Sequence, residues 1–252
     1  MTTQPEASPA KEAFLQRIRQ ALGRAEPATS PPDHPPLKTN LVRQEEKLRT
    51  IRAKVEARRE RNAERLAENA TKVGWHVHRV ETHDEAAAAV AAIAAGLHAR
   101  NVVRTAEDCF RQADYDGPLR RARAAPIILA SGRNRSRDSL KATAFDADLG
   151  VTGVSWAIAE TASCVIVPRR GVARLASLAP PVYVAIVGIE QILETLDDYF
   201  ATVRLEHMKG RGHVAAYANF ISGPSRTADI EQTLTVGVHG PGVVHMLIVG
   251  RE

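Results

Sequence analysis

From residue 75 onward, short runs rich in Val and Ile alternate with segments that carry a helical pattern. The expected strands are 75–80, 101–105, 126–131, 156–168 around a break, 182–188, 220–223 and 243–250. Helices are expected at about 82–99 and 189–203. Because strands that alternate with helices form parallel sheets with covered faces, the pattern predicts an α/β fold with a mostly parallel sheet and flanking helices. Ligands of such sheets bind beyond the carboxyl ends of strands, so the loops after 160, 188, 223 and 240 are the expected positions of a site.

The first 73 residues differ from the rest in charge. They hold 15 Lys and Arg against 10 Asp and Glu, whereas the remaining residues hold 19 of each, so the net charge of +5 belongs to this segment. Residues 11–23 are expected to form a helix, and five prolines between 27 and 36 predict an extended linker. Residues 41–73 read as one long charged helix with an apolar stripe. We therefore expect a helical, Pro-linked basic extension over 1–73 and an α/β domain over 74–252.

Composition limits the classes of function. Acids are interleaved with bases along 41–73, which favours a solvated helix packed by one narrow face over a nucleic-acid-binding helix. The neutral charge of the main domain also argues against a nucleic-acid partner. No apolar run reaches the roughly 18 residues of a membrane span, and the N-terminal residues lack an apolar signal core, so a cytoplasmic protein is expected.

Two cysteines, Cys109 and Cys164, are present in the chain. An iron–sulfur cluster takes about four cysteine ligands, so this chain by itself cannot supply such a site. No metal site is predicted, and the purified protein is expected to show no iron–sulfur absorption.

The segment GVSWAIAETASCVIVP, residues 153–168, places a glutamate inside an apolar alternation. A carboxylate buried in such a strand is costly unless it is paired. Either Glu160 is a buried site carboxylate with the Thr161 hydroxyl nearby, or the strand breaks there and the glutamate bonds to backbone amides of a turn. The residues alone leave both interpretations open.

The segment RLASLAPPVYVAIVG, residues 174–188, leads into an apolar strand through two prolines. The prolines indicate a rigid, extended entry into the core. Arg174 and Ser177 precede them, and Arg174 is a candidate to neutralise an anion or Glu160.

The segment ISGPSRTADIE, residues 221–231, combines a Gly-Pro turn with hydroxyls, a cation and acids. The pattern predicts a helix capped by Ser225 or Thr227, with Asp229 in its first turn. Free amides at a helix start attract anions, and Arg226 adds a fork of donors, which suits a carboxylate or phosphate group. The alternative is a well-capped helix with an exposed arginine.

The segment GVHGPGVVH, residues 237–245, allows tight backbone turns before the last strand, Gly240 among them. His239 is a candidate general acid or base near pH 7. We expect its loop to meet the loop after residue 223 at one end of the sheet, with Glu160 and Arg174 lining the same cleft.

Taken together, AETAS, RLASLAPPVYVAIV, ISGPSRTADIEQTL and GVHGPGVVHMLIV resemble the LUD domain of the lactate utilization protein C family. FLQRIRQALGR near the start is similar to that family's opening helix. The resemblance is close over about 150–250 and holds in outline over 75–150. It implies a fold similar to the sugar-phosphate isomerase and CoA-transferase group. It also implies a role in oxidising L-lactate to pyruvate beside partner proteins that carry the iron–sulfur clusters, with no cofactor on this chain.

Two other classes of function stay open. One is a free-standing enzyme that acts on a carboxylate or an acyl-CoA, with Glu160 as nucleophile or base. The other is a non-catalytic scaffold whose basic helix binds partners. The separate charge balance further predicts that 1–73 are dispensable for folding of 74–252 but matter for assembly.

Overall fold

The computed structural model describes residues 9–23, 40–130, 136–209, 217–228 and 234–250. Its contacts divide the chain into two compact units, Met1–Asn40 and Leu41–Glu252. In the first unit, the one helix described is α1, Pro9–Ala21, which lies within the expected segment 11–23 apart from its first two residues.

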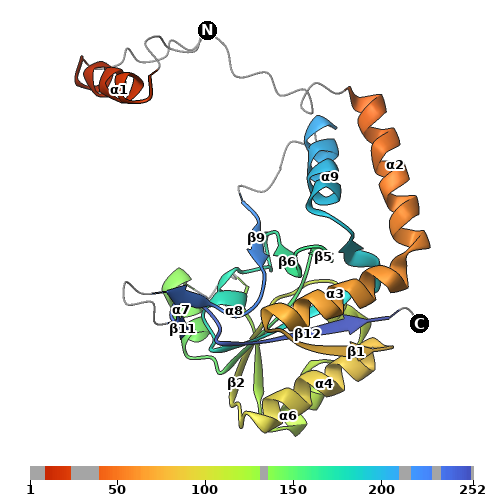
Figure 1. Cartoon of the computed structure of the whole chain (residues 1–252). Helices are drawn as coiled ribbons and strands as arrows, with labels where there is room; N and C mark the ends of the chain where they lie inside the picture. Colours follow the sequence, from red (N-terminus) through yellow and green to blue (C-terminus); the bar gives the residue numbers. More distant parts are fainter. Residues whose placement is uncertain (1–8, 24–39, 131–135, 210–216, 229–233, 251–252) are drawn as a thin grey trace. The chain divides into compact units, whose positions relative to one another are not determined.

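The larger unit is built on a six-stranded sheet in which every neighbouring pair runs parallel (Figure 1). The spatial order is β1-β12-β7-β4-β2-β3. The strands are β1 His76–Val80, β2 Asn101–Arg104, β3 Ala125–Ile128, β4 Leu149–Gly153, β7 Val182–Gly188 and β12 Val243–Val249. The predicted α/β class with a mostly parallel sheet is confirmed.

One face of this sheet packs on the helices that connect its first strands. These are α4 His83–Gly96, α5 Cys109–Gln112 and α6 Asp116–Arg121. Thr82 caps α4 by accepting a hydrogen bond from the amide of Glu85. Small residues of α4, such as Ala87 and Ala94, let the helix approach Val184 and Leu247 of the central strands, and all four are buried.

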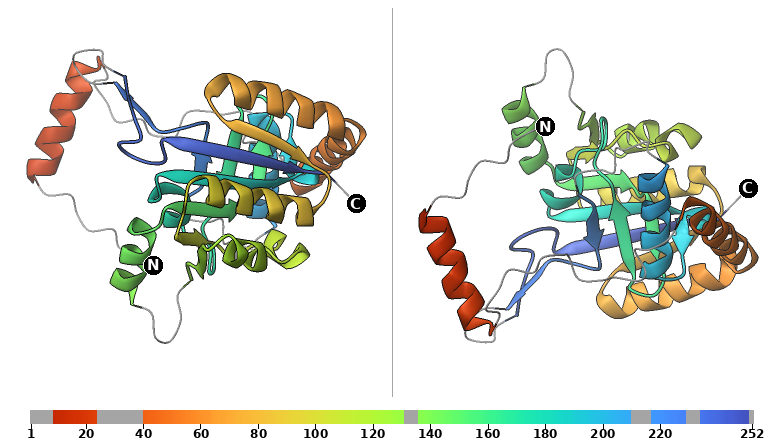
Figure 2. Two further views of the ribbon diagram at one scale, coloured as in Figure 1. Left: turned by 90° about the horizontal axis from the view of Figure 1, so that it is seen from below. Right: turned by 90° about the horizontal axis from the view of Figure 1, so that it is seen from above.

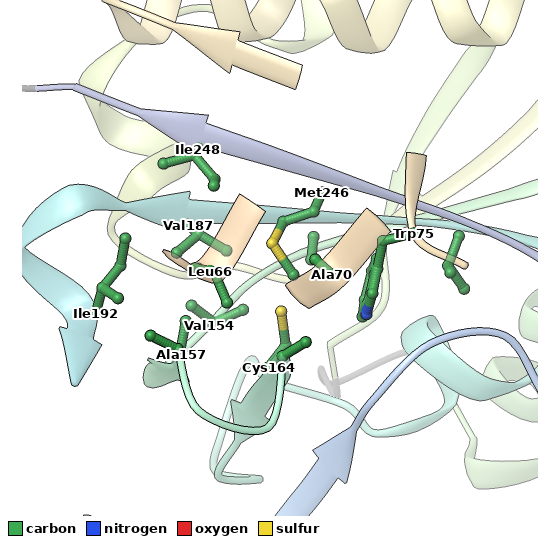
Figure 3. Packing of buried hydrophobic residues seen from close by; sticks show 14 of the residues in the cluster. Leu66, Ala70, Trp75, Val154, Ala157, Cys164, Val187, Ile192, Met246 and Ile248 are labelled. Atoms are coloured by element: carbon green, nitrogen blue, oxygen red, sulfur yellow. The ribbon is translucent and has the colours of Figure 1, made fainter. Parts of the chain in front are cut away.

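The opposite face of the sheet is covered by a second sheet and by α3, Arg59–Val73. The second sheet has the order β8-β5-β6-β9, with β5 Trp156–Ile158, β6 Ser163–Ile166, β8 Ile192–Leu193 and β9 Asn219–Ile221. Leu66 and Ala70 of α3 lie between Met246 of β12 and Cys164 of β6 (Figure 3). All four are fully buried, so α3 is part of the main core.

A further layer consists of α2 Leu41–Ala57 and α9 Leu196–Met208, which contact each other along their length (Figures 1 and 2). Leu48, Ile51 and Val55 of α2 pack with Leu205 of α9 on the outer face of the second sheet. The charged helix therefore does pack one narrow apolar face on the domain, as favoured from its sequence. It is interrupted at Arg58 and forms two helices where one was expected.

The boundary between the compact units falls at Asn40–Leu41 and not after residue 73. The physical reason is the apolar stripe of α2 and α3, whose residues Leu48, Ile51, Leu66 and Ala70 are buried in the larger unit. The charge of residues 41–73 lies on the remaining faces of the two helices.

Two expected elements differ in the structure, and one strand was not expected. The stretch expected as one helix over 189–203 is a 3₁₀ turn, Ile189–Gln191, followed by β8 and then α9, because Ile192 and Leu193 pair with β5. The helix expected after Thr227 is absent from the described residues there. These form β10 Arg226–Ala228 and β11 Leu234–Val236, an antiparallel pair. Strand β4 was not expected at all.

Two short helices complete the unit: α7 Arg137–Phe145 and α8 Leu175–Leu178. They cover a small cluster that contains Val103, Leu129 and Ala176. Within the part of the chain that the structure describes, no helix combines the length and the apolar character that a membrane span requires.

Candidate functional site

Glu160 lies in the turn between β5 and β6 and is exposed. Its Oε2 accepts a hydrogen bond of 3.1 Å from the amide of Leu196, the first residue of α9. A carboxylate at a helix N-terminus is favourable because it satisfies a free amide and faces the positive end of the helix dipole. The strand thus breaks at Glu160, and the buried-carboxylate interpretation is wrong.

Thr161 belongs to a short chain of hydroxyl groups. Its Oγ1 lies 2.8 Å from Oγ of Ser163, which in turn lies 2.6 Å from Oγ of Ser222. These contacts tie the turn to the end of β9. Ala162, between the two, has a φ of 51°, a left-handed conformation that forms the tight turn.

Arg174 and Ser177 lie on either side of the start of α8. Ser177 is fully buried and donates a hydrogen bond of 3.0 Å to the carbonyl of Arg174. The guanidinium of Arg174 lies over the ring of Tyr217, 5.2 Å from its centroid. Among the described residues, no hydrogen bond or ion pair joins Arg174 to Glu160, so the expected pairing is not formed.

Arg226 binds the end of α3. Its Nη2 donates a hydrogen bond of 3.0 Å to the carbonyl of Val73, one of the carbonyls that a helix C-terminus leaves free. Arg226 and Pro224 also pack over Gly74, which ends the helix with a φ of 102°. Arg226 is therefore a clamp between the hairpin and α3. Thr227 sits in β10 opposite Thr235, and Asp229 lies outside the described residues.

The loops around residues 223 and 237 do meet, as expected. The Ser225 amide donates to the carbonyl of Pro241, the amide of Gly237 donates to Ser225, and the amide of His239 donates to Ser225 Oγ at 3.3 Å. Gly240 packs beside Ser225 as well. His239 is exposed and borders a cleft of about 380 Å³ lined mainly by apolar residues, namely Phe145, Leu175, Leu178, Ala179, Pro181 and Val238.

This meeting point lies at the wrong edge of the sheet for the expected ligand site. The amides of Gly242 and Val243 donate to the carbonyl of Pro181, so the loops lie where β12 and β7 begin. The loop after 223 follows β9 of the second sheet, and the loop after 240 precedes β12, so neither lies at the carboxyl edge of the six-stranded sheet as expected. Ser225, His239 and Gly240 are brought together, but Glu160 and Arg174 are elsewhere.

The carboxyl edge has a topological switch point between β2 and β4. The chain leaves β2 toward β3 on one side, and it leaves β4 toward β7 on the other. Parallel sheets bind ligands in the crevice formed at such a point. The residues there are Thr105 and Glu107 after β2, and Gly153 at the end of β4.

Glu107 is the buried carboxyl group of this crevice, with only 5% of its surface exposed. Its Oε2 accepts hydrogen bonds from the Thr105 hydroxyl and from the amide of Gly153, the latter at 2.7 Å. Its Oε1 is buried and has no partner among the described residues. Burial raises the pKa of Glu107, and the hydrogen bonds and Arg169 offset part of this effect.

Arg104 holds the end of β2 in place. Its guanidinium forms a two-bond pair with Asp116 of α6, at 2.7 and 2.9 Å, and lies over the ring of Phe110. This pair lowers the pKa of Asp116, first through the hydrogen bonds from Arg104. The pair fixes the backbone from which Thr105 and Glu107 project.

The turn Arg169–Val172 separates the crevice from a second feature. The carbonyl of Gly171 accepts from the amide of Ala106, next to Glu107, and Gly171 has a φ of 84°. On its other side the turn borders a cleft of about 620 Å³ beside the carboxyl end of β3. We call it the basic cleft; its charged lining residues are Arg137, Asp138, Lys141, Arg169, Arg170 and Arg174.

Sequence reasoning found Arg174 but missed Glu107 and the other cations of the basic cleft. The visible signals were a carboxylate shortly after the strand expected at 101–105, and the pair Arg169–Arg170 before a glycine. Neither belongs to a recognisable motif.

The described residues contain no group of three or more His, Cys, Asp or Glu side chains that could hold a metal ion. Cys164 is fully buried and Cys109 lies next to Glu107 and Gly153. Burial raises the pKa of both thiols.

Known proteins resemble this chain over most of its length. The family model described as the LUD domain matches residues 63–249. The chain is 27% identical to lactate utilization protein C of Halalkalibacterium halodurans over 237 residues, which is 92% of this chain and 94% of that protein. Other proteins of that name match over less than half of their length.

Two further likenesses are more limited. Lactate utilization protein B of Shouchella clausii is 30% identical over 115 residues, 45% of this chain and 22% of that protein. The crystal structure of a DUF162 family protein from Deinococcus radiodurans superposes with a TM-score of 0.51 at 21% identity, covering 76% of this chain and 98% of that one. The likeness to the Deinococcus radiodurans protein is one of fold alone.

Proposed function

Because the chain belongs to the LUD domain family, we propose that it acts in lactate utilization, as a component without iron–sulfur clusters in a system that oxidises L-lactate to pyruvate. The observation that carries the proposal is the match to a lactate utilization protein C along 94% of that protein's length. The match spans both the core helix α3 and the six-stranded sheet, since the family model covers 63–249.

The proposal assigns the redox centres to partner subunits. Oxidation of lactate releases two electrons, and this chain has two cysteines where an iron–sulfur cluster takes about four cysteine ligands. Iron–sulfur proteins that accept the electrons are therefore the proposed partners, and the chain is proposed to work with them in the cytoplasm.

The test is a reconstitution under anaerobic conditions. The chain would be co-expressed with the products of neighbouring genes rich in C-x-x-C motifs, and L-lactate-dependent reduction of a dye would be measured with and without it. We expect co-purification and loss of activity when the chain is omitted. Equal rates with and without the chain would refute the proposal; D-lactate is the control substrate.

A second candidate is catalysis by this chain itself on a carboxylate or acyl-CoA. The supporting observation is Glu107, a buried carboxyl group with a raised pKa at the switch point. Such a group suits proton transfer better than the exposed Glu160 does. The test measures turnover by the isolated chain and by its Glu107→Gln and Glu160→Gln variants. Activity that is lost in Glu107→Gln and kept in Glu160→Gln supports catalysis at Glu107, the reverse result places it at Glu160, and no turnover of carboxylates or acyl-CoA thioesters by the isolated chain refutes this candidate.

A further inference from the structure

The basic cleft gathers cations from three separate segments of the chain. Arg137 and Lys141 come from α7, Arg169 and Arg170 from the turn after β6, and Arg174 from the start of α8. Against these five bases stands one acid, Asp138, a net charge of +4 along the lining.

In the described part of the chain these cations form no salt bridge, and Arg169 acts on Glu107 only from beyond salt-bridge distance. Among the described residues, none of the five lies within salt-bridge distance of an Asp or Glu, although nine other such pairs are formed. Like charges gathered in a cleft repel one another and raise the local concentration of anions. The lining therefore favours a ligand that carries several negative charges.

The start of α7 adds to this field. Arg137 is its first residue, and Ser136 caps it by accepting from the amide of Ser139. A cation in the first turn of a helix opposes the positive end of the helix dipole, and Asp138 offsets only one charge. A bound anion would offset both the repulsion among the cations and the unfavourable position of Arg137 at the positive end of the helix dipole.

An aromatic ring borders the same cleft. Tyr217 is 46% exposed, and the Arg174 guanidinium lies 5.2 Å from its ring centroid. An arginine held over a ring keeps that ring in place at the rim. The exposed part of the ring can stack on a planar group of a ligand.

We propose that the basic cleft binds a diphosphate group joined to a planar ring, as in a nucleoside diphosphate or a coenzyme built on one. A diphosphate carries about three negative charges, which suits a net charge of +4, whereas lactate carries one. A volume of about 620 Å³ lies in the range of small-molecule sites and far exceeds what a three-carbon acid fills. The inference stands on the cleft and does not depend on the proposed function.

The test is calorimetric titration of the full chain with inorganic pyrophosphate, ADP and L-lactate at low and high salt. We expect both phosphates to bind, more weakly at high salt, and L-lactate to bind at least tenfold more weakly than pyrophosphate. Arg170→Gln and Lys141→Gln should each weaken both phosphates by about tenfold, because each removes a charge-assisted hydrogen bond. No binding of pyrophosphate, or equal binding of L-lactate, would overturn the proposal.

Two variants control the result. Arg100→Gln changes an exposed arginine where β2 begins, on the other edge of the sheet, and should leave both affinities unchanged. Tyr217→Ala should weaken ADP by about fivefold or more and leave pyrophosphate unchanged, because stacking on the ring is lost. Equal losses in Arg100→Gln and Arg170→Gln would show attraction by overall charge only, and an unchanged ADP affinity in Tyr217→Ala would remove the ring from the proposal.

Discussion

At the amino edge of the six-stranded sheet the loops are held by backbone groups, whereas at the carboxyl edge charged side chains surround a crevice and a cleft. Ser225, Gly237 and Pro241 bond through their amides and carbonyls at the first edge. At the second, Glu107 is buried with one oxygen that has no partner among the described residues, and five cations line the basic cleft. The comparison teaches that the segments richest in glycine and proline shape the fold, while the capacity for chemistry lies in residues without a motif.

The largest expected effect breaks the support of the amino edge. Deleting 1–73 removes α3, whose Leu66 and Ala70 are fully buried and whose Val73 carbonyl binds Arg226. Loss of one buried leucine costs about 2–5 kcal/mol, and a domain has about 5–15 kcal/mol in all, so this truncated chain should not fold. Deleting 1–40 is the control and should leave the chemical denaturation curve unchanged. A cooperative unfolding transition in the chain that lacks 1–73 would contradict this prediction.

A smaller effect tests the close approach at the hairpin. Gly223 has a φ of 107°, and an added Cβ would lie 2.7 Å from the carbonyl of Val73. Gly223→Ala should therefore lower the free energy of unfolding by about 2–4 kcal/mol, measured in urea. Gly96→Ala is the control, since a Cβ there meets nothing within 4 Å. If both variants have the same free energy of unfolding, the amino edge tolerates rearrangement.

Arg226→Ala tests whether the amino edge holds a ligand or only stabilises the fold. The exposed side chain makes one hydrogen bond to a helix carbonyl, so its loss should cost about 1 kcal/mol of stability. Pyrophosphate binding should not change in Arg226→Ala. Arg170→Gln should instead weaken pyrophosphate binding and leave the stability unchanged. Loss of binding in Arg226→Ala would return the ligand site to the amino edge.

The smallest effect is on the pH dependence of stability. The raised pKa of Glu107 means that the folded chain keeps this proton to higher pH than the unfolded chain, whose glutamate ionises near 4.5. The folded state then binds more protons over that range, so its stability falls as the pH rises above about 4.5. Glu107→Gln does not titrate and should lack this part of the decline.

Urea unfolding from pH 4.5 to 8 checks this, with Glu160→Gln as the exposed control. The stability of Glu107→Gln relative to the native chain should grow with pH, and that of the control should not. Parallel curves for all three chains would show that Glu107 ionises normally.

Most of the sheet follows from local sequence, because β1, β7 and β12 are apolar runs bounded by turns. Strand β4, with the sequence LGVTG, was missed because two glycines hide a strand whose burial comes from pairing with β2 and β7. The hairpin was expected as a helix because TADIEQTL has good capping residues, yet Arg226 and Thr227 pair with the segment before Gly237. Tertiary pairing overrides local propensity at both places.

The site was harder to predict than the fold. Of the five cations in the basic cleft, the sequence pattern pointed to Arg174 alone. The cleft brings together cations that lie up to 37 residues apart, from Arg137 to Arg174. The position of Glu107 at a switch point depends on strand order, which the sequence pattern does not give.

The pairing of β1 with β12 affects how the protein can fold during its synthesis. His76 and His245, partners across these strands, are separated by 169 positions in the chain. During synthesis β1 therefore emerges long before β12, its one neighbour among the described strands of this sheet. Contacts of such high sequence separation form late and slow folding, and an unpaired strand edge invites association with other chains in the meantime. The edge of β1 that pairs with β12 therefore stays open until β12 has been synthesised.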